Sequence, residues 1–226
     1  MGGIDVVHLL LLCGAWVVYF LIHSLLASLA FKRWVLAHRP AAAPVYRLIF
    51  NLSATLLLLP PLWLTYSDRG PWLWQWSGAW WWFANGAALI ALGAIFWSLR
   101  WYDGSEFLGL SQWRRKSRGV EDQEAFHLSP LHRFVRHPWY SLGLVLVWTR
   151  DMDINLLVAA VLLSLYFVVG SRLEERKLIV YHGEIYRRYR QRVPGLVPLP
   201  WRWLRAGEAE RLIGGTTEGG RGLPDG

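Results

Sequence analysis

Four long apolar runs dominate the sequence and constrain its fold more than any other feature. Each is close to or above the ~20 residues that an α-helix needs to cross the hydrocarbon of a membrane. Hydrophobic residues make up 54% of the chain and charged residues 18%, whereas an ordinary globular domain has about 25% charged residues. A soluble protein would have too little polar surface to enclose four such helices. The sequence therefore predicts an all-α integral membrane protein, with its long apolar runs at residues 4–31, 48–65, 79–101 and 155–181.

The net charge of +8 is distributed according to a membrane topology. Lys and Arg concentrate between the first two runs, between the third and fourth runs, and after Gly170, whereas residues 66–78 contain only one of them. By the positive-inside rule we expect the N-terminus outside and the C-terminus in the cytoplasm. The first run lacks the basic leader and cleavage site of a signal peptide, so we interpret it as a retained span. Because the basic residues follow topology, they indicate membrane lipid and no nucleic acid as a partner.

A shorter apolar stretch begins at Pro138 and ends near Thr149, which is about 18 Å of helix at 1.5 Å per residue. Together with the run that follows it, this stretch predicts a tight helical hairpin and about five transmembrane helices in all. If the hairpin turns near Met152, Glu174 extends on the order of 10 Å beyond His137. The polar residues at the two ends of the hairpin are then expected to flank a gap.

Three polar motifs in and after this hairpin carry a family resemblance. They read Arg-His-Pro-Trp-Tyr at residues 136–140, Glu-Glu at 174–175 and Gly-Glu-x-Tyr-x-x-Tyr-x-x-x-Val-Pro at 183–194. In order and spacing, residues 126–198 resemble the isoprenylcysteine carboxyl methyltransferase family. This family is multi-pass, uses S-adenosylmethionine, and includes protein, phospholipid and small-thiol methyltransferases. Two positions depart from its pattern, because His132 replaces a tyrosine and His182 a phenylalanine.

The resemblance implies an S-adenosylmethionine pocket in the C-terminal half. Aromatic faces stabilise a sulfonium by cation–π attraction, and carboxylates accept hydrogen bonds from ribose hydroxyls or an α-amino group. The implied cofactor-binding residues are Phe126, His127, His132, His137, Pro138, Trp139, Tyr140, Glu174 and Glu175. Arg172, which would face the methyl acceptor, and Arg136 are expected among the catalytic residues. We thus expect N-terminal transmembrane helices over residues 1–101, the cofactor-binding loop, hairpin and cytoplasmic helix over 102–205, and a disordered tail over 206–226.

Weaker motifs in the N-terminal half narrow the branch of the family. They are His23-Ser24-x-x-Ala27-Ser28, Tyr46-Arg47-x-x-x-Asn51 and Glu106-x-x-Gly109-Leu110-x-Gln112. They resemble the branch that holds methanethiol S-methyltransferases and NnrU-like proteins, which implies a small thiol as the acceptor and a bacterial inner membrane as the location. Glu106 and Gln112 then join the catalytic candidates.

Other functions remain open at this point. The acceptor is alternatively an isoprenylcysteine carboxylate or a phospholipid amine. The chain is alternatively a non-catalytic NnrU-like membrane partner, or a membrane reductase that binds NADPH. We expect no metal site, because His127, His132 and His137 recur every five residues and do not share a helical face. The sequence does not indicate an oligomeric state.

Overall fold

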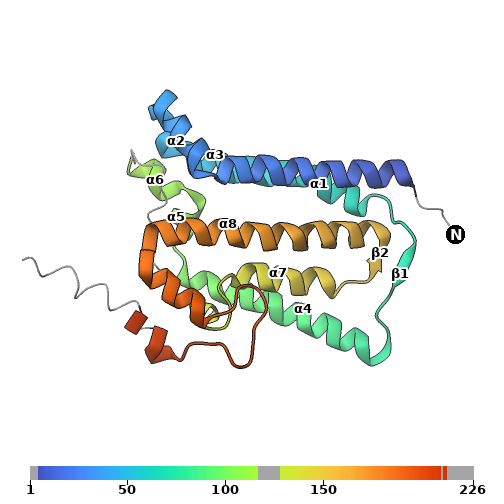
Figure 1. Cartoon of the computed structure of the whole chain (residues 1–226). Helices are drawn as coiled ribbons and strands as arrows, with labels where there is room; N and C mark the ends of the chain where they lie inside the picture. Colours follow the sequence, from blue (N-terminus) through green and yellow to red (C-terminus); the bar gives the residue numbers. More distant parts are fainter. Residues whose placement is uncertain (1–4, 117–127, 210, 213–226) are drawn as a thin grey trace, which may run out of the picture. The chain divides into compact units, whose positions relative to one another are not determined.

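Helices dominate the computed structural model, which describes residues 5–116, 128–209 and 211–212 (Figure 1). The elements, in chain order, are α1 (Val6–Ala27), α2 (Leu29–His38), η1 (Pro40–Val45), α3 (Tyr46–Tyr66), β1 (Trp72–Trp74), α4 (Gly78–Ser98), η2 (Leu99–Trp101), α5 (Gly104–Leu108), α6 (Leu110–Arg114), η3 (Pro130–Arg133), α7 (Pro138–Trp148), β2 (Met152–Asp153) and α8 (Ile154–Arg192).

Within the described residues, four helical stretches are long and apolar enough to cross a membrane. They are Val6–Ala27, Pro40–Tyr66, Gly78–Trp101 and Ile154–Arg192, and the shorter apolar helix α7 lies between the last two. Helices α7 and α8 follow one another with only residues 149–153 between them, which is the expected hairpin. The prediction of an all-α membrane protein with a C-terminal helical hairpin is therefore confirmed, with four full-length spans and one short helix.

The chain divides into two compact units, which we describe separately. Unit 1 comprises Met1–Asp122 and Leu144–Phe167, and unit 2 comprises Gln123–Gly143 and Val168–Gly226. Helices α7 and α8 each supply residues to both units.

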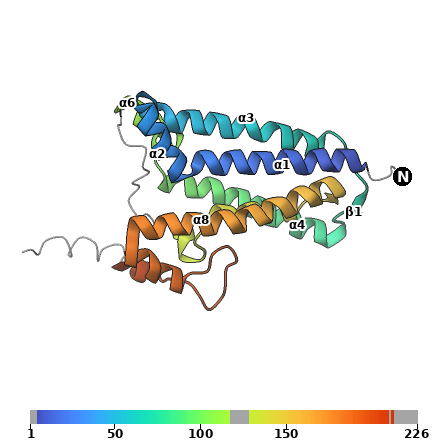
Figure 2. The ribbon, with the colours of Figure 1, turned by 45° about the horizontal axis from the view of Figure 1, so that its top comes forward.

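In unit 1, α1 packs along α3, and both helices run side by side for most of their length (Figure 2). Asp5 caps the start of α1 by accepting a hydrogen bond from the backbone of His8. Leu12 and Trp16 of α1 are fully buried against Ala159 of α8. The other side chains of α1 are exposed or half-buried, as expected for a helix whose outer face contacts lipid.

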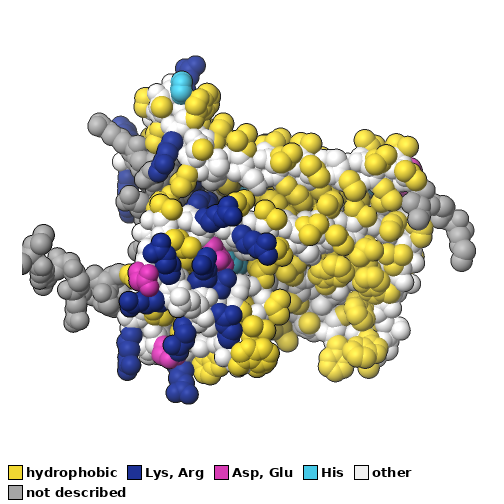
Figure 3. All heavy atoms as spheres, viewed as in Figure 1, with side chains coloured by type: hydrophobic (Ala, Val, Ile, Leu, Met, Phe, Trp, Pro, Cys, Tyr) yellow, Lys and Arg dark blue, Asp and Glu magenta, His cyan; other side chains and the backbone are white. Residues whose placement is uncertain are grey.

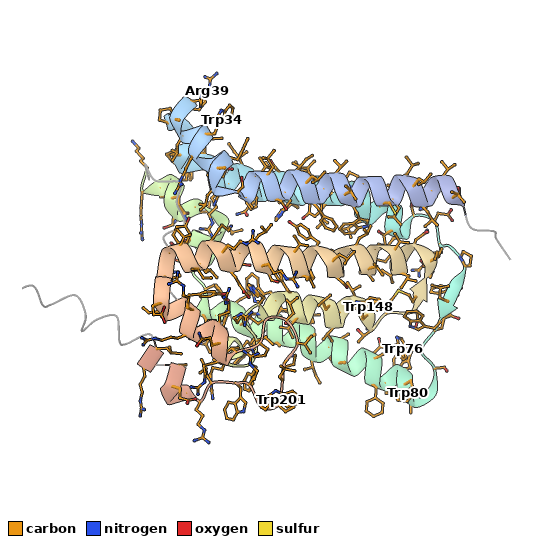
Figure 4. All side chains as sticks on the ribbon, in the orientation of Figure 1. Trp34, Arg39, Trp76, Trp80, Trp148 and Trp201 are labelled. Atoms are coloured by element: carbon orange, nitrogen blue, oxygen red, sulfur yellow. The ribbon has the colours of Figure 1, made fainter. Side chains whose placement is uncertain are left out.

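One end of unit 1 is closed by a short antiparallel pair, in which Trp72 lies opposite Asp153. Trp76 strengthens this closure, because its indole donates to the carbonyl of Arg150 (3.2 Å) and its backbone donates to Asp151 (2.9 Å). Figure 4 shows Trp76, Trp80 and Trp148 at this end of unit 1 and Trp34 and Arg39 at the other. A belt of tryptophans at one end fits the aromatic-rich boundary of a membrane.

Unit 2 is organised by a bend in α8 at Gly183, which has φ 53° and ψ −126° (Figure 1). A side chain would be strained in this conformation, so glycine is required here. The bend brings Tyr186, Tyr189 and Val193 together with Leu204 in the core of unit 2. The spaced tyrosines and valine of the third sequence motif are thus core residues.

Residues 206–209 of the expected tail are helical, and Ala209 is buried. Residues 210 and 213–226 lie outside the described residues.

Candidate active site

The centre of the candidate site is His137, which lies between two carboxylates in unit 2. Its Nδ1 donates to Oε2 of Glu174 (3.3 Å) and its Nε2 donates to Oε1 of Glu175 (3.2 Å). Because ionised carboxylates only accept, both ring nitrogens must carry a proton and the ring is an imidazolium. Burial disfavours this charge, but the hydrogen bonds to Glu174 and Glu175 outweigh burial and raise the pKa of His137 above its usual 6.5.

Arg136 anchors the second carboxylate of this cluster. Its Nη2 and Nε lie 2.7 and 2.8 Å from Oε1 of Glu175, and both side chains are largely buried. Its Nη1 donates to the backbone carbonyls of Arg190 and Val193. These contacts use four of the five N–H groups of the guanidinium to hold Glu175 and the backbone carbonyls of Arg190 and Val193.

The backbone around His137 is held by the residues that follow α8. The amide of Arg136 donates to the carbonyl of Pro194 (2.9 Å), and the amide of His137 donates to that of Gly195 (3.1 Å). The Ser141 hydroxyl donates to the carbonyls of His137 and Leu196. Sequence reasoning missed this frame, because backbone carbonyls leave no residue signature beyond the Val-Pro pair of the third motif.

The first turn of α7 presents the accessible face of the cluster. Pro138 begins the helix, where its missing N–H costs no hydrogen bond. The ring of Tyr140 stacks on that of His137 (centroids 5.5 Å apart, 9° between planes), and its hydroxyl donates to Glu174 (3.2 Å). The Glu174 side chain is 43% exposed, whereas that of Glu175 is 9% exposed. Glu174 is thus the carboxylate that a ligand can reach. Trp139 follows Pro138 and is half-buried.

His132 provides a neutral imidazole near this charged cluster. Its Nδ1 accepts hydrogen bonds from the backbone amide (3.2 Å) and the hydroxyl (2.8 Å) of Ser129, so the ring proton is on Nε2. Burial, reinforced by repulsion from His137 and opposed by attraction to Glu174, lowers the pKa of His132 to about 4. Ser129 was not foreseen as the residue that selects this tautomer.

The expected gap between the two polar groups is wrong, because the structure brings them into contact. In unit 1, the indole of Trp148 donates to Ser164, and in unit 2 His137 meets Glu175. These pairings centre the hairpin register near residue 156 and not near Met152. The reason is that the connection between α7 and α8 is not helical and contains the extended strand β2, in which a residue advances about 3.3 Å against 1.5 Å in a helix. A few extended residues on the α7 side therefore match a longer stretch of α8.

The remaining candidates are placed as follows. Arg172 is exposed on α8 and, within the described residues, makes no hydrogen bond or ion pair. Glu106 and Gln112 belong to unit 1, and the Gln112 amide donates to the carbonyl of Glu106 (3.3 Å). Phe126 and His127 lie outside the described residues. In the part of the chain that the structure describes, no group of three or more His, Cys, Asp or Glu side chains could hold a metal ion.

The segment with Glu106 and Gln112 is fastened to the start of α3. Asn51 donates to the carbonyls of Phe107 (3.0 Å) and Leu108 (3.1 Å), and Arg47 Nε donates to the first of these (3.1 Å). These are carbonyls at the C-terminus of α5, which have no partner within their own helix. Gly109 follows with φ 91°, and a Cβ there would lie 2.9 Å from the backbone nitrogen of Leu48. The second and third N-terminal motifs thus meet in one contact.

A second polar group lies among the spans of unit 1. His23 Nδ1 lies 2.7 Å from the hydroxyl of Tyr166, and the Ser24 hydroxyl lies 3.2 Å from the same atom. The Tyr166 ring stacks on Phe20 (4.1 Å). These contacts satisfy His23 within the bundle through neutral partners.

Known proteins that resemble this chain agree on its class. It is 33% identical over 200 residues to methanethiol S-methyltransferase 2 of Bradyrhizobium diazoefficiens, and this alignment covers 88% of this chain and 74% of the relative. It is 32% identical over 216 residues to methanethiol S-methyltransferase of Mycobacterium tuberculosis (89% and 81%). The match to the Pseudomonas enzyme of the same name is 31% over 186 residues (78% and 68%). No family model and no solved structure matches the chain.

The apolar helices and these relatives together define a membrane-embedded methyltransferase. The enzyme therefore works with a methyl donor. Within this class, the chain belongs to the methanethiol S-methyltransferase family.

Proposed function

We propose that this enzyme transfers the methyl group of S-adenosylmethionine to methanethiol and releases dimethyl sulfide. The observation that carries the proposal is that several relatives, aligned over most of this chain, share the name methanethiol S-methyltransferase. In the reaction, a bond forms between the thiol sulfur and the methyl carbon, the sulfonium–methyl bond breaks, and the thiol proton is released. S-adenosylhomocysteine is the second product.

The His137 cluster, which consists of Arg136, His137, Tyr140, Glu174 and Glu175, has the chemistry to hold this donor. The bound donor would supply an activated methyl group on a cationic sulfur. Glu174 offers a partly exposed carboxylate for hydroxyl or amino groups, and the aromatic ring of the half-buried Tyr140 suits a cation. His137 contacts both of these side chains and is itself held by Glu175, which Arg136 anchors. A rigid site of this kind lowers the entropic cost of aligning donor and acceptor.

Arg172, Glu106 and Gln112 are proposed to act on the acceptor side. Arg172 is an exposed cation with no partner within the described residues. The Oε1 atom of Gln112 is buried and accepts no hydrogen bond from the described residues, so it retains capacity for a donor. A thiol as small as methanethiol offers few contacts, and we therefore expect weak binding with selectivity set by size.

The activity is tested by headspace detection of the methyl thioether. Purified protein in detergent is incubated with S-adenosylmethionine and a panel that contains methanethiol, longer thiols, a prenylcysteine and a phospholipid amine. We expect methanethiol to be methylated and the last two to give little product. Methylation of prenylcysteine or the phospholipid without any small thiol would assign the chain to the alternative acceptor.

The cofactor is tested separately by thermal stabilisation. S-adenosylhomocysteine should raise the unfolding temperature, because a ligand that binds only the native state stabilises it. NADPH should have no effect. Stabilisation by NADPH alone would indicate a reductase, and stabilisation by neither nucleotide would favour a non-catalytic NnrU-like role.

We also propose that the protein lies in a bacterial inner membrane with its N-terminus outside and its C-terminus in the cytoplasm. The proposal is supported by the Lys and Arg residues between the first two apolar runs, between the third and fourth runs, and after Gly170. It is also supported by the tryptophans at one end of unit 1 (Figure 4). A reporter that functions only in the cytoplasm should be active when it is fused to the C-terminus. If instead a C-terminal reporter that functions only in the periplasm is active, the topology is the reverse.

A further inference from the structure

A tight turn at the end of unit 2 exposes an unusual set of apolar side chains. Leu199 and Arg202 pair across it, with the amide of Arg202 donating to the carbonyl of Leu199 (3.0 Å). Pro200 and Trp201 therefore occupy the corner, and proline is favoured at the first corner position of a β-turn. Trp201 is 75% exposed and Val197, just before the turn, is 66% exposed. Figure 4 shows the indole of Trp201 pointing outward.

Further exposed side chains extend this apolar area, which we call the Trp201 surface. Trp203 is 41% exposed and stacks on Phe134, which is 46% exposed (centroids 6.2 Å apart). The Trp201 surface consists of Phe134, Val197, Pro198, Pro200, Trp201 and Trp203. Exposed tryptophans that gather in this way mark an interaction site more often than a chance feature.

The Trp201 surface is held rigidly from below. Leu204 is buried, its amide donates to the carbonyl of Arg133 (3.0 Å), and Arg133 Nε donates back to the Leu204 carbonyl (2.9 Å). Arg202 reaches the carbonyls of Arg190 and Gln191 (3.4 and 2.6 Å). The exposure of Trp201 is therefore part of the folded state. Fraying of a loose end does not account for it.

The charge around the Trp201 surface identifies the kind of partner. The described residues of unit 2 contain twelve Lys or Arg and only four Asp or Glu. Figure 3 shows Lys and Arg gathered over the charged end of α8 and the segment that follows it. Indoles favour the boundary between headgroups and acyl chains, and basic side chains favour anionic headgroups. Pro198 and Pro200 also lack N–H groups, which would be costly to bury without a partner.

We infer that the Trp201 surface is an interfacial anchor, which inserts its apolar side chains at the surface of an anionic lipid leaflet. The occupant is the membrane that the long apolar helices cross, because α8 is continuous from its apolar part into unit 2. The anchor would limit the motion of the segment after α8. Residues Pro194 and Gly195 of that segment also hold the backbone of Arg136 and His137. The inference does not depend on the identity of the methyl acceptor.

The test uses single cysteines labelled with an environment-sensitive fluorophore. The natural Cys13 is first removed as Cys13→Ser, and Val197→Cys or Trp201→Cys is then introduced for labelling. Glu184→Cys is the matched control, because this side chain is 59% exposed and lies in polar ion pairs of unit 2. Each labelled protein is placed in nanodiscs of phosphatidylcholine alone or of phosphatidylcholine with phosphatidylglycerol.

Labels at 197 and 201 should show blue-shifted emission and lose intensity when the nanodiscs contain doxyl-labelled lipid, more so with phosphatidylglycerol. The label at 184 should remain quenchable by aqueous iodide. If the labels at 197 and 201 are as accessible to iodide as the control in both nanodiscs, the inference is wrong. It is equally wrong if these labels are shielded without quenching by doxyl lipid, which would indicate contact with a second protein copy.

Discussion

The two units use polar side chains in opposite ways. In the spans of unit 1, polar groups pair with neutral partners, such as Trp16 with Thr65 and His23 with Tyr166. In unit 2, the central contacts join formal charges, with Glu175 held by both Arg136 and His137. Charges within hydrocarbon are costly, whereas a site for a charged ligand needs them. The comparison teaches that unit 1 uses polar contacts to pack its helices and unit 2 uses them to build a site.

The largest effect is expected from removing the carboxylate at the centre of unit 2. Glu175→Ala leaves Arg136 largely buried without its anionic partner, and it leaves His137 with Glu174 as its remaining carboxylate contact. The loss of one member of a buried ion pair costs about 3–5 kcal/mol. Thermal unfolding in detergent should show this loss. Glu184→Ala removes only surface ion pairs with Arg187 and Arg188 and should cost less than about 1 kcal/mol. If Glu175→Ala and Glu184→Ala lose the same stability, the buried ion pairs of Glu175 contribute no more than the surface ion pairs of Glu184.

The next effect concerns pH and the two histidines of unit 2. The pKa of His132 is lowered to about 4 in the folded protein. The stability that its neutral form contributes is therefore complete above pH 6.5 and is lost as the pH falls from 6.5 towards 4. The pKa of His137 is raised above 6.5, so its contribution is complete below 6.5 and is lost as the pH rises through the raised pKa. One pKa unit corresponds to about 1.4 kcal/mol.

Unit 2 should therefore lose stability on both sides of pH 6.5. His132→Asn should reduce the loss on the acid side, and His137→Gln should reduce the loss on the alkaline side, as measured by unfolding temperature against pH. If both variants keep the profile of the parent protein, these histidines do not carry it.

A smaller effect is expected from the accessible carboxylate. Glu174→Gln should weaken S-adenosylhomocysteine binding by about 1–3 kcal/mol, because a ligand group would lose its charged acceptor. The stability should change less than in Glu175→Ala, since Glu174 is 43% exposed. Isothermal titration calorimetry measures the binding, with Glu184→Gln as the control of the same chemistry. Wild-type affinity in both Glu174→Gln and His137→Ala would place the cofactor elsewhere.

The smallest effect is expected in unit 1. Tyr166→Phe removes the hydroxyl that contacts His23 and Ser24 and should cost about 1 kcal/mol of stability. The variant should bind S-adenosylhomocysteine like the parent protein, because the contact belongs to packing. A loss of binding as large as in Glu174→Gln would show that the two units share the cofactor function.

The sequence by itself determined the apolar helices, because the length and composition of an apolar run decide whether it can cross a membrane. It also indicated the family, because Arg136, His137 and Tyr140 lie in one short motif and Glu174 with Glu175 in another. Motifs of this kind are local and can be read without coordinates. The tyrosines at 186 and 189 were part of the pattern, but their place in the core of unit 2 was not evident from it.

Only the tertiary structure decided how these motifs meet. Rigid helix geometry placed Glu174 beyond His137, whereas the two side chains are 3.3 Å apart. The difference arises in the short extended connection before α8, where each residue advances about twice as far as in a helix. The structure also showed that Arg136 is held by Glu175 and by the carbonyls of Arg190 and Val193. Backbone carbonyls are the same in every residue, so their role depends on the path of the chain and not on the residue type.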